Sequence, residues 1–205
     1  MPLEWLKRAL GGILGAGADT VTESRLVHGV RVDVVNTRPD IDTERVFRRA
    51  ESVLALVQRY QPWRFAHLGR DLDGIVVRRF PSRGAYFSET RSCLLELTFM
   101  ANEQFSDAQV AACLVHEGTH ARLDHLASRF GVTSFSEAPA RHERICRRAE
   151  LSFGLVVPDG APVVERALAS LALTDDEVAP AIDWREAARR TEAVDGAALR
   201  REGEG

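Results

Sequence analysis

The chain has 205 residues, of which 45% are hydrophobic and 28% charged, and its formal net charge is −3. This composition is typical of an ordinary soluble globular protein with enough apolar residues for a core. The slight negative charge excludes a basic footprint for nucleic acid, so no nucleic-acid partner is expected. Three cysteines (Cys93, Cys113 and Cys146) cannot form a complete disulfide framework, and reduced cysteines favour a cytoplasmic location.

Residues 1–22 are expected to form an N-terminal extension that allows two interpretations. Leucines at helical spacing between Met1 and Leu14 predict an amphipathic helix that docks on a membrane surface or on the domain itself. The run from Ala9 to Ala18 also resembles an export signal, but it contains four glycines, so export is the less favoured alternative. No segment reaches the roughly 20 apolar residues that a membrane span requires.

Residues 23–158 are expected to form one domain of the α+β class, with a small mixed sheet packed against helices. Leu26–Val35 alternates enough to be a strand, and Asp42–Tyr60 is an amphipathic helix with its apolar residues on one face. Three further strands are predicted between turn residues: Gly74–Phe80, Ala85–Phe87 and Cys93–Phe99. The predicted order is β-α-β-β-β-α-α.

A metal-binding pattern lies in the first of the two helices that follow. Residues 116–120 read His-Glu-Gly-Thr-His, which is H-E-x-x-H. Ser106 opens a capping box and Gly131 is a C-terminal stop, so the pattern lies well inside a helix. His116 and His120 are four residues apart and share one face, where they can hold one metal ion. Glu117 is the residue that a hydrolytic zinc site needs to accept a proton from metal-bound water.

The alternative is a helix with two surface histidines and a solvated glutamate. Two details count against it. The histidines share their face with Cys113 and Leu123, which is an apolar environment rather than a charged one. Gly118 inside a helix costs about 1 kcal/mol relative to alanine, so its presence makes sense only if something packs closely there.

A third ligand is expected from the next helix, because a catalytic zinc normally takes three protein ligands and leaves one position open. This helix is predicted to open at Ser136 and to run to Gly154. Glu143, Cys146 and Glu150 fall on one partly apolar stripe, where carboxylates are unusual unless a cation or a basic partner receives them. Glu–Arg pairs on a solvated face are the alternative for Glu150. A cysteine thiolate ligand is less favoured, because a closed site suits structure rather than hydrolysis.

Together the two helices resemble the gluzincin branch of zinc metallopeptidases, over roughly residues 85–158. The segment from Glu143 onward is similar to the one that carries the glutamate ligand in short phage-repressor-cleaving and stress-response metallopeptidases. The resemblance implies a zincin-like fold with one zinc ion held by His116, His120 and Glu143. It also implies that Glu150 orients a ligand histidine through its ring N–H, with Glu150 as the alternative ligand.

The function implied is zinc-dependent peptide hydrolysis, in which Glu117 takes a proton from zinc-bound water and hands it to the leaving amine. Larger relatives place a Tyr or His oxyanion donor downstream of the third ligand. Here Tyr60 and Tyr86 lie upstream, which leaves His142 as the candidate donor. The resemblance further implies that a peptide or protein substrate adds to an edge strand, near Tyr86 or near Leu95.

Two alternatives use the same metal ligands. One is a non-peptidase metal-dependent hydrolase, and the other is a metal-binding regulatory or interaction module without turnover.

Residues 159–205 are expected to form a C-terminal extension, with a helix at Val163–Leu173 and a new helix cap at Thr174. From Ala187 to Gly205 the sequence predicts a loosely held helix or a disordered tail.

Overall fold

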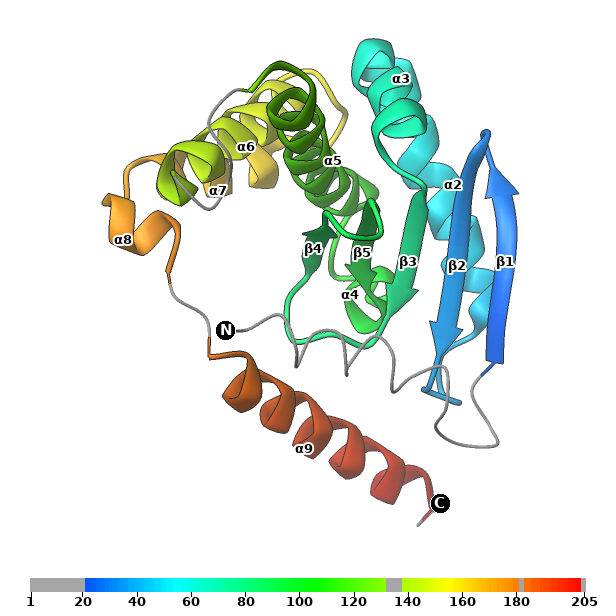
Figure 1. Cartoon of the computed structure of the whole chain (residues 1–205). Coiled ribbons are helices and arrows are strands. Elements are labelled where there is room, and N and C mark those ends of the chain that lie inside the picture. The colour runs from blue at the N-terminus through cyan, green and yellow to red at the C-terminus, as the bar shows by residue number, and fades with distance from the viewer. Residues whose placement is uncertain (1–20, 132–137, 181–182, 204–205) are drawn as a thin grey trace.

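The computed structural model describes residues 21–131, 138–180 and 183–203, which form one mixed sheet and eight helices (Figure 1). The α+β class is confirmed. The sheet has the order β1-β2-β3-β5-β4, in which β2, β3 and β5 are parallel and the two outer strands are antiparallel to their neighbours. Its strands are β1 (Val21–Val27), β2 (Val30–Asn36), β3 (Gly74–Arg78), β4 (Gly84–Phe87) and β5 (Ser92–Glu96).

The prediction of one strand over residues 26–35 is wrong, because this region is a hairpin. His28 and Gly29 both have positive φ, 48° and 83°, and they separate β1 from β2. A two-residue turn with positive φ at both positions matches the twist of antiparallel strands, which is why the chain reverses here. Val27 therefore pairs with Val30.

The predicted strand over residues 93–99 is also too long. Strand β5 ends at Glu96, and the short helix α4 (Leu97–Ala101) follows it directly. The Glu96 carboxylate accepts a hydrogen bond of 2.7 Å from the Phe99 amide, so Glu96 serves as the N-cap that begins this helix. The sequence prediction followed the apolar pattern of Leu97 and Phe99 and did not weigh the capping role of Glu96.

Two long helices cover the same face of the sheet. Helix α2 (Thr43–Tyr60) agrees with its prediction, and Asp42 caps its N-terminus by accepting from the Glu44 amide. Helix α5 (Asp107–Phe130) contacts β4, β5 and α2. The predicted capping box of Ser106 and the C-terminal stop at Gly131 (φ 63°) are both confirmed. Helix α3 (Pro62–Asp71), which the sequence prediction missed, packs on α2 and α5.

The remaining helices follow α5 in the chain. Helix α6 begins with Pro139 and packs against α5, whereas Ser136, its predicted first residue, lies outside the described residues. Val163 of the next helix belongs to the same hydrophobic core, so the packed core continues beyond residue 158. Thr174 forms its predicted capping box. These helices are α6 (Pro139–Gly154), α7 (Ala161–Leu171), α8 (Asp175–Val178) and α9 (Trp184–Gly203).

The predicted amphipathic segment of residues 1–22 lies almost wholly outside the described residues, although β1 already begins at Val21. Among the helices that the structure does describe, none combines the length and the apolar character needed to cross a bilayer.

The Asp195 carboxylate connects α9 to arginines at the carboxyl ends of the parallel strands. Figure 1 shows α9 beyond this end of the sheet. Asp195 of α9 accepts hydrogen bonds from Arg38, after β2, at 3.0 Å and from Arg79, after β3, at 2.9 Å. Arg79 also pairs with Glu96 at the end of β5. Both arginine side chains are largely buried, so these charged contacts are shielded from water.

Removing this carboxylate should release α9. For Asp195→Ala we expect tryptic cleavage within α9 to accelerate about tenfold or more, because hydrogen bonds to charged groups contribute about 1.5–3 kcal/mol and cleavage follows the open population. Limited proteolysis with mass spectrometry measures the rate. Glu192→Ala, an exposed change on the same helix, is the control and should leave the rate unchanged. Equal rates in both variants would show that other contacts hold α9.

Candidate metal centre

Helices α5 and α6 bring three predicted ligand residues to one point. His116 and His120 lie one turn apart on α5, and their Nε2 atoms are 3.2 Å apart. Glu143 arrives from α6, with Oε2 at 3.3 Å from the His116 Nε2 and Oε1 at 3.2 Å from the His120 Nε2. All three residues are buried or nearly so, and Glu143 comes to the histidine pair from 23 residues after His120 in the chain.

The spacing of these donor atoms fits a tetrahedral metal ion. Zinc binds histidine nitrogen and carboxylate oxygen at about 2.0 Å, and tetrahedral ligands at that bond length lie about 3.3 Å from one another. The two ring nitrogens are separated by close to this value, and the Glu143 carboxylate faces them at similar distances through its two oxygens, Oε2 toward His116 and Oε1 toward His120. Two histidines and one glutamate are also a donor set of hydrolytic zinc sites. The residues therefore fit the ion that the sequence implies.

The second carboxylate of α6 lies on the other side of the His116 ring. Glu150 Oε1 is 3.1 Å from the His116 Nδ1, although the nitrogen is not aligned for a good hydrogen bond. Glu150 is fully buried and also pairs with Arg147 at 2.9 Å and with Arg166 of α7 at 2.8 Å. Glu143 and Glu150 thus face different nitrogens of one imidazole. No pattern in the sequence indicated Arg166, because this residue lies outside both motif helices.

Burial and charge together perturb the ionisation of this cluster. Burial would lower the pKa of His116, but the carboxylates of Glu143 and Glu150 outweigh it and raise that pKa to about 9. Burial would raise the pKa of Glu143, yet the two facing histidines hold it well below its usual range. For Glu117 burial dominates and raises the pKa. A carboxyl group with a raised pKa is a better proton acceptor, as a general base requires.

A thiol also lies near the histidine pair. Cys146, on α6 between the two glutamates, places its sulfur within 4.8 Å of a ring nitrogen of both His116 and His120. All three cysteines are buried, and none of them is in a disulfide. Burial raises the pKa of the Cys146 thiol well above its ordinary value. His116, His120 and Cys146 therefore form an alternative donor set that the sequence prediction ranked low.

The edge strand β4 packs directly against the Glu117 side of α5. A Cβ at Gly84 would lie 2.7 Å from the Cys113 sulfur and 2.9 Å from a Glu117 carboxylate oxygen, so only glycine permits this approach. The sequence prediction treated Gly84 as a turn residue, and nothing in its local pattern revealed the contact. Of the two strands expected to receive a substrate, the one near Leu95 is β5, which pairs on both sides. Of these two strands, only β4, which carries Tyr86, is an edge strand of the sheet.

Substituting Gly84 should therefore disturb the centre. For Gly84→Ala we expect a loss of about 1–3 kcal/mol in the free energy of unfolding, because the methyl group overpacks against Cys113 and Glu117. Gly69→Ala in α3 is the matched control. A Cβ there meets nothing within 4 Å, so this variant should be about 0.5–1 kcal/mol more stable than the wild type. Urea denaturation measures both values, and equal stability of the two variants would contradict the close approach.

His142, the predicted oxyanion donor, is buried in α6 next to Glu143. Adjacent helical side chains diverge by about 100°, and Glu143 is the one that faces the histidine pair. The role of His142 stays a prediction. Tyr86, in contrast, reaches α5 from β4, where its hydroxyl donates a 2.9 Å hydrogen bond to Asp124. Asp124 is seven residues after Glu117 and so lies on the same helix face.

Comparison of the chain with protein-family models, with curated proteins and with solved structures gave no match. The centre is therefore interpreted from its own residues. It combines two histidines, a facing carboxylate, a nearby thiol and a buried carboxylate with a raised pKa, set beside an edge strand.

Proposed function

We propose that His116, His120 and Glu143 bind one zinc ion and that the chain is a metal-dependent hydrolase cleaving peptide bonds. The observation that carries this proposal is that the Glu143 carboxylate faces the Nε2 atoms of His116 and His120 at 3.3 and 3.2 Å, while those two nitrogens lie 3.2 Å apart, so three groups of a zinc donor set converge on one point. Three carboxylates, Glu117, Glu143 and Glu150, also surround the pair of histidines, so a divalent cation would offset buried negative charge.

When bound, zinc lowers the pKa of a water molecule and polarises the scissile carbonyl. Glu117 accepts the proton of the attacking water and returns it to the leaving amine. Glu150, which Arg147 and Arg166 hold in place, lies 3.1 Å from the His116 Nδ1 and would orient the ring from that side, which leaves Nε2 for the ion. Gly84 of β4 packs directly against the Glu117 carboxylate on the side away from the cavity-lining residues of α5.

The substrate is an extended peptide segment that pairs with β4, an edge strand of the sheet formed by the described residues. This strand lies at the end of the sheet and packs against α5 on the side of Glu117. An edge strand offers backbone groups to a peptide in any sequence context, so the strand supplies affinity and the side chains around it supply selectivity.

A second candidate function is a metal-binding module without turnover. The observation that favours it is the Cys146 sulfur near both histidines, because a fourth protein ligand would close the coordination sphere. In that case the ion stabilises the fold and Glu117 has no water to deprotonate.

The test is zinc content by elemental analysis, together with cleavage of a random peptide library. We expect about one zinc per chain in wild type and in Cys146→Ser, strong loss in His120→Ala and Glu143→Ala, and cleavage by wild type. Loss of zinc in Cys146→Ser as well as in His120→Ala and Glu143→Ala, with no cleavage by wild type, would establish the closed site instead. Wild-type protein prepared with zinc but containing none would refute both candidates.

A further inference from the structure

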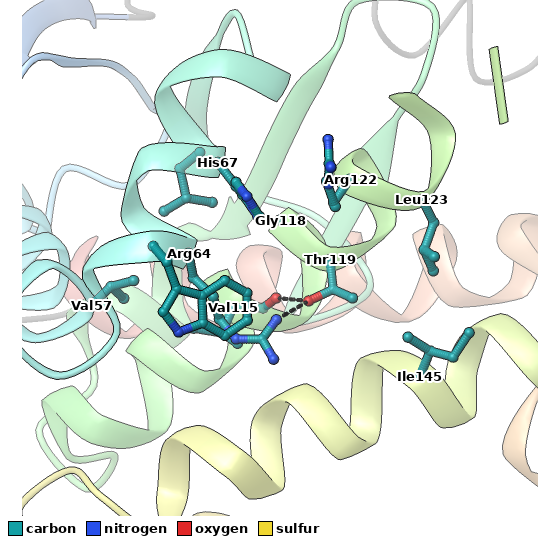
Figure 2. Close-up of a pocket in the computed structure, with 11 residues that line it drawn as sticks. Val57, Arg64, His67, Val115, Gly118, Thr119, Arg122, Leu123 and Ile145 are labelled. Atoms are coloured by element: carbon teal, nitrogen blue, oxygen red, sulfur yellow. Dashed lines mark hydrogen bonds between the residues drawn. The ribbon is translucent and has the colours of Figure 1, made fainter. Parts of the chain in front are cut away.

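A cavity of about 250 Å³ lies between α3, α5 and α6, and Figure 2 shows the side chains around it. Gly118, Thr119 and Arg122 line it from α5. At 100° per residue these positions point away from Glu117, so the cavity lies on the opposite flank of α5 from β4. Its walls are mainly aliphatic: Val57, Leu68, Val115, Leu123 and Ile145.

One partly buried cation at this cavity has no carboxylate partner among the described residues. The Nε of Arg64 is buried and without a hydrogen-bond partner, and NH1 makes only a long 3.4 Å contact with the Thr119 hydroxyl, as Figure 2 shows. No carboxylate among the described residues lies within ion-pair distance of Arg64, whereas Arg147 and Arg166 both pair with Glu150. A partly buried guanidinium whose Nε has no hydrogen-bond partner is costly, so a ligand that supplies an anion would be favoured here.

The surroundings specify what kind of anion fits. The Trp63 ring, 52% exposed, lies 4.1 Å from the Arg64 guanidinium carbon and meets the His67 ring edge-on. A small apolar cavity with one aromatic wall and a few polar groups is typical of ligand sites. The other arginine, Arg122, lies 3.7 Å from Asp71, and this carboxylate would repel a dianion such as phosphate. A monoanion with an apolar body suits the cavity best.

We propose that this cavity binds a small hydrophobic carboxylic acid. Its carboxylate accepts hydrogen bonds from the Arg64 guanidinium, and its apolar body packs against Trp63 and the aliphatic walls. A guanidinium matches a carboxylate in geometry because both are planar and can form two parallel hydrogen bonds. The site is separate from the proposed metal centre and does not depend on zinc or on hydrolysis.

The experiment is titration of the full chain with benzoate, 3-phenylpropionate and octanoate, followed by calorimetry and by tryptophan fluorescence, which Trp63 reports directly. We expect saturable 1:1 binding of at least one acid, binding of its primary amide weakened by about tenfold or more, and no competition by inorganic phosphate. Failure of all three acids to bind, or equal binding of acid and amide, would overturn the proposal. So would tighter binding of phosphate.

Two variants locate the site. Arg64→Met keeps the apolar stem and removes the charge, and it should weaken the acid by about tenfold or more. Its melting temperature should not fall, because an unpaired buried cation is removed, and this measurement excludes misfolding as the cause. Arg148→Met, an exposed change on α6, should bind as wild type does. Equal affinity in Arg64→Met and wild type would place any binding elsewhere.

Discussion

Replacing Glu117 by glutamine is expected to lower peptide cleavage by about two to four orders of magnitude while leaving the zinc content at wild-type level. The amide has nearly the shape of the carboxylate but cannot accept a proton from water. Because Glu117 is not among the proposed ligands, the ion stays in place. Cleavage of the peptide library and elemental analysis on the same preparation measure the two properties together.

The same variant gives a second readout that needs no substrate. In the metal-free protein, Glu117 is a buried carboxylate near Glu143 and Glu150, and burial already raises its pKa. Removing this charge should increase the melting temperature measured with a chelator present. Glu165→Gln, on the exposed side of α7, is the control and should change neither property. Full cleavage by Glu117→Gln would exclude its role as the base.

Replacing Glu150 by alanine is expected to cost about 3–5 kcal/mol in the free energy of unfolding. The carboxylate is fully buried, and its loss leaves Arg147 and Arg166 without their shared partner and the His116 Nδ1 without its neighbour. Urea denaturation of the metal-free protein measures the change. Glu165→Ala should shift the value by no more than about 0.5 kcal/mol, as surface changes usually do.

The contribution of Glu150 to the free energy of unfolding should also decrease as the pH falls. Burial opposes its ionisation, but His116 and the two arginines outweigh burial and hold its pKa at about 2, against 4.5 in the unfolded chain. The folded state is therefore stabilised fully above pH 4.5 and loses this contribution as the pH falls toward 2. The stability difference between wild type and Glu150→Gln should shrink over that range. A difference that stays constant down to pH 2 would contradict the assignment.

The parts of the fold that the sequence predicted well are those specified by local patterns. Helix α2 has strong apolar periodicity and forms where that pattern predicts, and α5 begins where the capping box of Ser106 predicts. The short helix α3 was missed because no side chain caps it and Pro62 is its main signal. The hairpin was missed because His28-Gly29 is not one of the strongest turn dipeptides.

The residues of the candidate site also fall into two groups, those specified by a local pattern and those brought together by packing. The spacing of His116, Glu117 and His120 within one helix is a local property, so the sequence alone indicated that the two histidines face one ion. The arrival of Arg166 at Glu150, and of Gly84 at Glu117, depends on how distant elements pack. Such contacts leave no periodic signal in a single sequence, so only the three-dimensional structure revealed them.

The brevity of β4 has a consequence for self-association. A long flat edge strand invites a second copy of the same sheet, which leads to aggregates or exchanged strands between molecules. At about 3.3 Å per residue, the four residues from Gly84 to Phe87 span only about 13 Å. So short an edge can hold a narrow segment of chain but offers too few backbone groups to nucleate a growing stack of sheets. The protein can therefore leave this edge open at high concentration without the risk that a longer strand would carry.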